Sequence, residues 1–400
     1  MNFDVDFSLK CRDFRKDGAV LAGAGRGIGA VSLQSRPALK PADAYEKDAH
    51  GGTSTMMKPP GKPGGQRSGG KRATLRTISE LTGLSPSTVS LALRGGERLK
   101  PETYRKVVEA AQQLGYIPDR AGVRLRTGKT NVIALVLERT DETIDFARYL
   151  IQGIGHAIQG TRYHMNVSPE FGAAGTVDSI RYIIDNRTAD GVIITHTTAR
   201  DPRVQLLMDE GFPFVTHGRT EFYAPHPYHD FHSEEFVRLA VERMAAKGRK
   251  RILLVVGREI TNNYHTIVTS FQRVSARLGL STQVISPEID RPASAEMREF
   301  GHEIARMSPR PDGIICDSEL RSIFMIAGLE DEGVMAGRDF HFICKQTSDL
   351  LPALYPQIDT VEEDVFTAGM ELARLLIRRI NGEPAETLRT LGEPKVNWRD

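Results

Sequence analysis

The sequence predicts a small all-α domain followed by a larger α/β domain that contains two parallel β-sheets. Three observations support this fold class. Residues 74–115 place apolar side chains at helical spacing, whereas strand-like and helix-like runs alternate from Asn131 onward. The charge divides as well, since residues 71–130 hold 12 Lys and Arg against 5 Asp and Glu, and residues 131–400 hold 30 against 39. We therefore expect the basic module to meet a polyanion, although a solvated basic face would show the same imbalance.

The composition excludes several classes of protein. Of 400 residues, 40% are hydrophobic and 26% are charged, which is ordinary globular usage. No apolar run approaches the roughly 18–20 residues that a membrane helix needs, and the first residues do not read as a secretory signal. Three scattered cysteines, Cys11, Cys316 and Cys344, are too few for a disulfide framework or a zinc cluster. We expect a cytoplasmic protein without a cofactor or a metal.

Residues 1–70 are expected to form a flexible extension. Between Gly51 and Gly70 there are seven glycines and three prolines, and such a segment cannot bury enough apolar surface to offset the entropy of ordering it. Met56 and Met57 directly precede its basic part. One hypothesis is therefore that the natural chain starts near these two residues and that the segment before them is an over-extended reading frame.

Two short helices separated by a turn are predicted next. Thr74 can cap the first helix, and Gly83 can end it. Ser85 and Pro86 are a typical N-cap and first-turn pair, which predicts a second helix over about 86–94.

A third helix is predicted from Pro101 to just before Gly115. The apolar side chains at helical spacing in the three helices are expected to share one small core. They are Leu75, Ile78, Leu81, Val89, Leu93, Tyr104, Val107, Ala111 and Leu114.

The second helix is the candidate surface for reading DNA. Hydroxyl groups gather on its exposed face, at Ser85, Ser87, Thr88 and Ser90. A helix that follows a tight turn can enter the major groove, where small polar side chains contact base edges or phosphates. The alternative is an ordinary three-helix bundle with a polar face, but the basic charge of residues 71–130 favours DNA.

The rest of the chain predicts a parallel α/β architecture with helices on both faces of each sheet. The expected strands are Val132–Leu137, Gly191–Thr195, Pro213–Thr216, Arg251–Val256, Thr282–Ile285, Gly313–Cys316 and Phe340–Cys344. Helical stretches lie between them, among them Phe146–Gln159, Ser233–Lys247 and Arg321–Glu332. His226, His229 and His232 suggest a metal site, but no Cys or Asp at suitable spacing supports one.

Several segments together resemble the lactose-repressor (LacI/GalR) family of bacterial transcription regulators. The resemblance is dense in the N-terminal part, in residues 77–93, 101–103, 114–118 and 125–130. It is weaker in the body, in residues 238–244, 248–252, 358–365 and 368–373. It therefore covers about 74–400 and implies a lambda-repressor-like helix-turn-helix domain over 71–118, a hinge helix or linker over 119–130, and a periplasmic-binding-protein-like domain over 131–400.

The resemblance also implies roles for individual residues in DNA binding. Pro86, Ser87 and Leu91 match base-reading positions, with Leu91 suited to a thymine methyl group, and Leu125 matches the hinge leucine that wedges into the minor groove. The hinge pairs with its copy, so a homodimer on a pseudo-palindromic operator is implied. The full set of expected DNA-binding residues is Thr74, Ser85, Pro86, Ser87, Thr88, Ser90, Leu91, Tyr116, Arg120, Arg124 and Leu125.

The larger domain is expected to bind an effector and to dimerise. Its subdomains are expected at about 131–229 with 360–382, and at 230–359 with 383–400. The cleft of such a fold lies at the carboxyl ends of the strands, and sugars are held there by planar polar groups and an aromatic ring. The expected effector-binding residues are Phe146, His196, Arg219, Asp230, His265, Asp317, Glu319 and Gln346.

The resulting prediction is a sequence-specific, nucleoid-associated regulator, a repressor whose operator affinity depends on a small sugar or sugar derivative. The alternative is a sugar-binding protein without a regulatory role, for which residues 71–130 would have no use. An enzyme is not expected, because no nucleophile, paired carboxylates or metal ligands stand at catalytic spacing.

Overall fold

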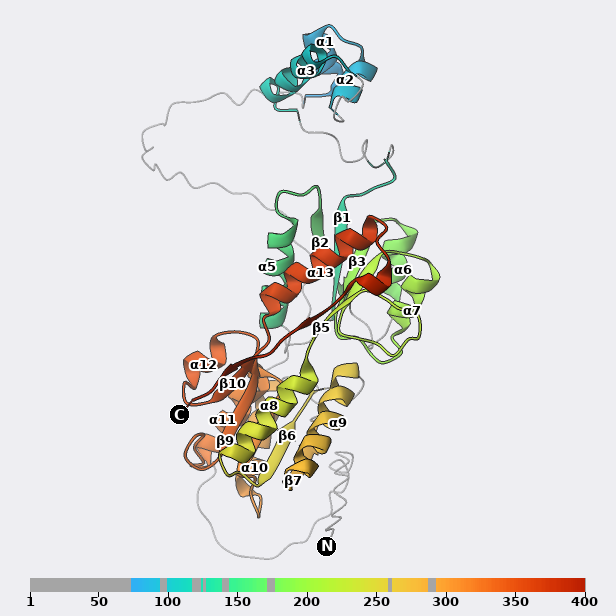
Figure 1. The fold of residues 1–400 in the computed structure, drawn as a ribbon. Coiled ribbons are helices and arrows are strands. Elements are labelled where there is room, and N and C mark those ends of the chain that lie inside the picture. The colour runs from blue at the N-terminus through green and yellow to red at the C-terminus, as the bar shows by residue number, and fades with distance from the viewer. Residues whose placement is uncertain are drawn as a thin grey trace, which may run out of the picture. The chain divides into compact units, whose positions relative to one another are not determined.

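The computed structural model describes residues 73–93, 99–116, 124, 127–138, 144–170, 177–257, 261–286 and 293–399 (Figure 1). The expected extension over 1–70 and the proposed start near Met56 lie outside the described residues, as do Cys11, Arg120 and Leu125. The expected hinge over 119–130 is described only at Arg124 and from Thr127 onward. None of the helices in these ranges is long and apolar enough to cross a bilayer.

The N-terminal domain is the three-helix bundle that the sequence predicts. Its helices are α1 Leu75–Thr82, α2 Pro86–Ala92 and α3 Pro101–Gln113. Thr74 caps α1 by accepting a hydrogen bond from the Thr77 amide at 3.3 Å, and Gly83 ends the helix at φ 70°. Glycine suits this left-handed position because it has no Cβ.

Two of the expected core residues of the bundle were assigned wrongly. Leu81 is 49% exposed and Tyr104 is 39% exposed, and the buried positions are instead Ile78, Val89, Ala92, Val107, Ala110 and Ala111. Three helical residues turn about 300°, so positions taken at i, i+3 and i+6 drift by about 60° at each step. Leu81 lies two such steps from Leu75 and has therefore left the buried face.

The larger domain contains two six-stranded sheets, as expected. The first sheet has the order β11-β5-β4-β3-β1-β2, and all its neighbouring strands pair in parallel. Its strands are β1 Val132–Glu138, β2 His164–Glu170, β3 Gly191–Ile194, β4 Phe214–His217, β5 Tyr228–Phe231 and β11 Arg389–Gly392.

The second sheet has the order β12-β10-β9-β8-β6-β7, and only its edge strand β12 pairs antiparallel. Its strands are β6 Arg251–Val255, β7 Ser281–Ile285, β8 Gly313–Cys316, β9 His341–Gln346, β10 Asp359–Glu362 and β12 Lys395–Asn397. Cys316 and Cys344 are partners in the register of β8 and β9, and both are buried free thiols. Burial raises the pKa of Cys316 to about 11 and that of Cys344 well above its ordinary value.

Helices cover both faces of each sheet (Figure 1). Successive strand residues point to opposite faces, so Ile133 and Leu135 pack under one pair of helices and Ala134 and Val136 under the other. The helices of the first sheet are α5 Ile144–Ile158 with α13 Val365–Ile380, and α6 Asp178–Asp185 with α7 Pro202–Asp209. Those of the second sheet are α8 Ser233–Ala246 with α9 Asn262–Arg277, and α10 Ala293–Arg306 with α11 Glu319–Asp331 and the short α12 Leu350–Leu354.

The chain passes between the two sheets three times: between β5 and α8, between β10 and α13, and between β11 and β12. The expected boundaries at the second and third passages were wrong. Strand β10 belongs to the second sheet, where Val361 is part of the core, although residues from 360 were assigned to the first subdomain. Strand β11 belongs to the first sheet through its pairing with β5, although residues from 383 were assigned to the second. Both strands are short, so their hydropathy does not locate them.

Helices α5 and α13 approach each other unusually closely at two glycines. A Cβ added to Gly153 would lie 2.0 Å from the Phe366 carbonyl oxygen, and one added to Gly369 would lie 2.4 Å from that of Leu150. Glycine is required here because backbone, rather than a movable side chain, occupies the space. In contrast, a Cβ on Gly155 of the same helix would meet nothing within 4 Å.

We expect Gly153→Ala to destabilise the protein by several kcal/mol, because helix α5 must move away from α13. Gly155→Ala is the matched control, and it should be neutral or stabilise by about 0.5–1 kcal/mol because alanine favours the helix. Urea unfolding of both variants measures the difference. Equal stability of the two variants would contradict the close contact.

Candidate functional site

The start of α2 exposes the residues that were expected to read DNA. Ser85, Pro86 and Ser87 are exposed, and the helix buries its opposite face at Val89 and Ala92. The Ser85 hydroxyl accepts a hydrogen bond from the Thr88 amide at 3.2 Å and lies 2.8 Å from the Ser87 hydroxyl. The cap therefore fixes the helix start and presents its small polar groups to solvent.

The other expected DNA-binding residues of the bundle differ in exposure. Thr88, Ser90 and Leu91 are half-buried on the flank of α2. Thr74 is exposed, and its side chain caps α1. Tyr116 is half-buried against the bundle core just after α3.

The hinge segment reaches the first sheet at two described points. The Arg124 guanidinium donates to the main-chain oxygen of Asn186 at 2.9 Å, so the residue expected to contact phosphate is bound to the body here. The Asp190 carboxylate accepts hydrogen bonds from the amides of Thr130 and Asn131, at 2.6 and 2.9 Å. Asp190 thus anchors the point where the hinge segment becomes β1.

An aromatic corner forms at the carboxyl edge of the first sheet. Phe146 lies edge-on to the ring of His196, with centroids 5.7 Å apart, and edge-on to that of His217 at 5.2 Å. His196 follows β3 and His217 ends β4, so both come from adjacent strand ends. The expected residues Phe146 and His196 are therefore brought together, and His217, which was not expected, joins them. Its position at the end of a short buried strand was the available signal.

A buried carboxylate lies beside this corner, on the segment between β10 and α13 that joins the two sheets. Glu363 is 4% exposed and accepts a hydrogen bond from the Lys345 ammonium of β9 at 2.8 Å. Burial alone would raise the pKa of Glu363, but the positive charge of Lys345 and the contact with His217 hold it far below its ordinary value.

The contact between His217 and Glu363 is an ion pair whose geometry falls short of a hydrogen bond. His217 Nε2 and Glu363 Oε1 lie 3.3 Å apart, and among the described residues neither atom has another hydrogen-bond partner. A ligand group that bonds to both atoms could therefore complete this contact.

Arg219 and Asp230 are brought together, but mainly by pairing with each other. The Arg219 guanidinium donates to Asp230 and, at 3.0 Å, to Glu234 at the start of α8. Burial raises the pKa of Asp230, and the Arg219 charge only partly opposes this. The expected role of Arg219 in effector binding stays a prediction, and in this structure its guanidinium also links the turn after β4 to the start of α8.

The expected residues on the second sheet are held by separate partners. Asp317 accepts from the Gly257 amide at 3.1 Å and from Arg321 at 3.0 Å. Glu319 is buried and accepts from the Thr347 hydroxyl at 2.9 Å.

Gln346 and His265 complete the expected set. Gln346 is 6% exposed, and its amide oxygen accepts from the Thr360 hydroxyl at 2.6 Å. His265 on α9 is exposed, and its described ring contact is with Tyr264 at 5.4 Å, outside the aromatic corner.

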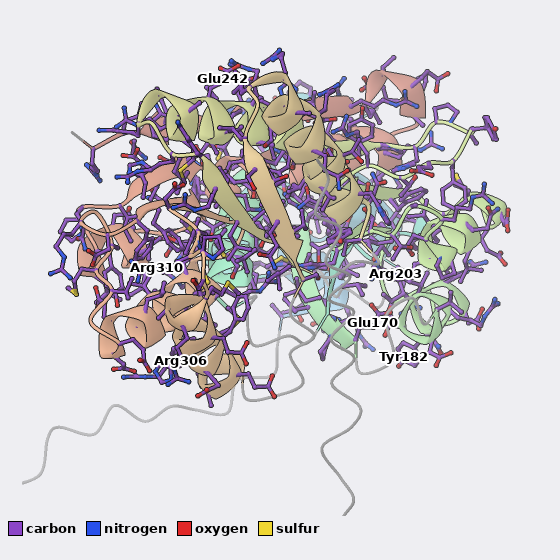
Figure 2. The ribbon with its side chains drawn as sticks, turned by 90° about the horizontal axis from the view of Figure 1, so that it is seen from below. Glu170, Tyr182, Arg203, Glu242, Arg306 and Arg310 are labelled. Atoms are coloured by element: carbon purple, nitrogen blue, oxygen red, sulfur yellow. The ribbon has the colours of Figure 1, made fainter. Side chains whose placement is uncertain are left out.

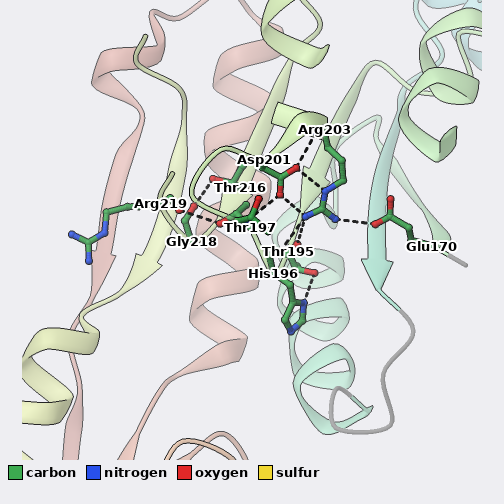
Figure 3. Close-up of polar contacts among 10 residues, drawn as sticks. Glu170, Thr195, His196, Thr197, Asp201, Arg203, Thr216, Gly218 and Arg219 are labelled. Atoms are coloured by element: carbon green, nitrogen blue, oxygen red, sulfur yellow. Dashed lines mark hydrogen bonds and ion pairs between the residues drawn. The ribbon is translucent and has the colours of Figure 1, made fainter. Parts of the chain in front are cut away.

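A buried ion-pair cluster beside the corner was not anticipated from the sequence (Figure 3). Arg203 of α7 is 3% exposed and pairs with Asp201 at 2.7 Å and with Glu170 of β2 at 2.9 Å. By contrast, pairs such as Arg306 with Glu332 and Arg277 with Glu242 lie at the surface, where Figure 2 shows Arg306 and Glu242 at the periphery. Exposed ion pairs contribute only about 0–1 kcal/mol to the free energy of unfolding. The buried cluster is therefore the one whose role needs an explanation.

The three histidines considered for a metal site have separate partners. His226 contacts the Thr220 hydroxyl at 2.7 Å, His229 contacts that of Thr390 at 2.9 Å, and His232 contacts Glu393 at 3.1 Å. In the part of the chain that the structure describes, no group of His, Cys, Asp and Glu could hold a metal ion.

Comparisons with family models agree with the two kinds of domain. The model for bacterial regulatory proteins of the lacI family matches residues 74–119. The model for a periplasmic binding protein-like domain matches residues 241–400.

Characterised relatives cover most of the chain. The HTH-type transcriptional regulator AglR of Rhizobium meliloti is 28% identical over 317 residues, which is 76% of this chain and 86% of the relative. The HTH-type transcriptional regulator CelR of Thermobifida fusca is 24% identical over 340 residues, which is 82% of this chain and 98% of the relative.

Solved structures show the same fold. A lac repressor dimer bound to operator and an anti-inducer has a TM-score of 0.70 at 17% identity, covering 82% of this chain and 98% of that one. A complex of the transcriptional regulator CelR with cellobiose has a TM-score of 0.60 at 23% identity, covering 82% of this chain and 99% of that one.

The buried His229 predicts that the body loses stability in mild acid. Burial, helped by the charge of His217, lowers the pKa of His229 from 6.5 to about 4, so the folded state binds this proton less readily than the unfolded state. The stabilising contribution is therefore complete above pH 6.5 and is lost as the pH falls from 6.5 towards 4, by at most about 3 kcal/mol.

We expect His229→Gln to reduce this dependence, measured as Tm between pH 7.5 and pH 4.5. The exposed His156 provides the control, because His156→Gln should leave the dependence as it is. An unchanged acid sensitivity of the His229→Gln variant would show that other groups cause the loss.

Proposed function

Because the chain belongs to the lacI family of bacterial regulatory proteins, we propose that it is a sequence-specific transcriptional repressor controlled by a small sugar-like effector. It acts in the cytoplasm at the nucleoid, where its operator lies. The matched relatives are transcriptional regulators, which supports a regulatory rather than a catalytic role.

DNA binding is supported by the exposed start of α2. Ser85, Pro86 and Ser87 face solvent on a helix that is fixed from behind by Val89 and Ala92. The basic charge of residues 71–130 supplies salt-sensitive affinity for phosphates, while the α2 side chains discriminate bases. A homodimer on a pseudo-palindromic operator fits this arrangement, and the lac repressor structure with the same fold is a dimer on operator.

The single observation that carries the effector proposal is the pair of His217 Nε2 and Glu363 Oε1, which lie 3.3 Å apart without hydrogen-bond geometry. A sugar hydroxyl can donate to the carboxylate and accept from an imidazole N–H. The adjacent ring of Phe146 can cover the apolar face of a sugar. The matched CelR structure contains cellobiose, which is consistent with a saccharide in a domain of this fold.

The effector can alter DNA binding through the three passages between the sheets. His217 belongs to the first sheet, and Glu363 follows the last residue of β10 in the second, so a ligand held by both favours one mutual arrangement. The first sheet also carries Asn186 and Asp190, which hold the hinge segment. Coupling between such sites is typically about 1–3 kcal/mol. A sugar-binding protein without a regulatory role would leave the N-terminal bundle unexplained.

The DNA-binding part of the proposal predicts different effects for two substitutions. Ser87→Ala should weaken binding to the selected operator by about 1–3 kcal/mol and leave binding to random duplex unchanged, because it removes a base contact. Arg124→Gln should weaken binding to both and reduce the salt dependence, provided that Arg124 exchanges its bond to Asn186 for a phosphate when DNA binds.

Fluorescence anisotropy at several salt concentrations, on an operator obtained by genomic selection, measures both effects. Failure of the unsubstituted protein to select any duplex would contradict the proposed function itself.

The effector part predicts that Glu363→Gln lowers saccharide affinity at least about tenfold, because it replaces a charged acceptor by a neutral one. The unsubstituted protein is first screened by thermal shift against gluco- and galacto-configured disaccharides, including cellobiose. Calorimetry with the disaccharide that gives the largest shift then compares the variants. The control is Glu362→Gln, because the neighbouring Glu362 pairs only at the surface with Lys395. Equal affinity in both variants would exclude Glu363 from the site.

A further inference from the structure

Arg203 uses its whole guanidinium group inside the protein. Nε donates to Asp201 Oδ1 at 3.0 Å, and Nη1 donates to Glu170 Oε2 at 2.9 Å. Nη2 donates to Asp201 Oδ2 at 2.7 Å and to the main-chain oxygens of Thr195 and His196 at 3.2 and 3.1 Å. One side chain therefore joins the ends of β2 and β3 to the start of α7 (Figure 3).

The turn after β3, to which Arg203 donates hydrogen bonds, contains a strained residue. His196 has φ 53°, a left-handed conformation that is strained for a residue with a side chain. The bonds from Arg203 to the carbonyls of Thr195 and His196 hold this conformation in place, and Asp201 accepts from the Thr198 amide at 3.2 Å on the other side of the turn.

This strain has a consequence for the aromatic corner. The His196 side chain starts from this backbone conformation, its Nδ1 lies 3.1 Å from the Thr195 hydroxyl, and its ring lies 5.7 Å from that of Phe146. Thr197, the next residue, donates from its hydroxyl to the main-chain oxygen of Arg219 at 3.1 Å, which ties this turn to the one after β4 (Figure 3).

We propose that Arg203 is a positioning residue of the effector site, which fixes the turn after β3 so that His196 stands against Phe146. Arg203 acts through His196 and does not contact the effector. The inference rests on the proposed function only in treating the corner as an effector site.

Arginine is required by the geometry of the cluster. Its planar group reaches two carboxylates and two carbonyls at once, whereas a lysine ammonium is a point donor on a flexible chain. Burial would lower the pKa of Arg203, but hydrogen bonds and charges from Asp201 and Glu170 outweigh this effect, so the group stays charged. The same turn contains Arg200, which is exposed, and it provides a matched control.

The first experiment needs no ligand. The full chain is labelled with 13C-histidine, and the NMR signal of the His196 ring is assigned as the one that disappears in His196→Gln. The ring current of Phe146 changes the chemical shift of this signal. We expect Arg203→Lys to move this signal towards the position found in Phe146→Leu, and Arg200→Lys to leave it in place. An unmoved signal in a folded Arg203→Lys protein would overturn the proposal.

Glu170→Gln covers the case in which Arg203→Lys does not fold, because it weakens one bond of the cluster and leaves Arg203 present. A smaller shift in the same direction supports the proposal, and no shift overturns it. This readout does not depend on whether the protein binds sugar or DNA, so its failure is distinct from failure of the proposed function.

The second experiment is a double-mutant cycle with the disaccharide that gives the largest thermal shift in the screen above. When His196 is present, Arg203→Lys should lower the affinity for the disaccharide about tenfold. In a His196→Ala background the same substitution should change the affinity less than about twofold. An equal loss in both backgrounds would contradict action through His196.

Discussion

The arrangement of the larger domain depends on a buried carboxylate at a passage between its two sheets. Glu363 is bonded to Lys345 of the second sheet and lies against His217 of the first. A charge at 4% exposure is tolerable only if it is paired, and the lysine supplies that pairing from one side. On the other side Glu363 Oε1 faces His217 Nε2 at 3.3 Å, without hydrogen-bond geometry. The contact that joins the sheets is therefore also where we propose that the effector binds.

Both sheets bring polar side chains from several strands together at one edge. In a parallel sheet all carboxyl ends lie on one side, so residues just past the strands meet there although they are far apart in sequence. The opposite edges are closed by aspartates: Asp190 accepts amide hydrogen bonds at the start of β1, and Asp312 does so at the start of β6. Only the first of these adjoins the hinge segment. The two sheets are thus built alike, but only the first continues directly into the hinge segment, which is the basis for the signalling path proposed above.

Sequence patterns located the strands that are buried on both faces, because runs such as Gly191–Ile194 and Gly313–Cys316 are continuously apolar. They missed β2, β5, β10, β11 and β12, whose residues are mixed or polar and whose strand character comes from their neighbours in the sheet. Both His196 and Phe146 were candidates from their places after a strand and on the first helix, and their rings lie 5.7 Å apart. The sequence patterns could not show that Arg219 forms an ion pair with Asp230, or that Arg203 forms one with Glu170, which lies 33 residues away in the sequence. Such pairing depends on how the helices and strands pack.

The cysteines of β8 and β9 offer a practical route into the motions of this protein. Cys316 and Cys344 are fully buried and remain protonated at neutral pH. Thiol-reactive dyes should therefore not label them. Once Cys11 is replaced, a cysteine introduced at an exposed position on each sheet would accept a fluorophore without background labelling. Energy transfer between the two dyes would then report in real time whether the distance between the two sheets changes when a saccharide is added.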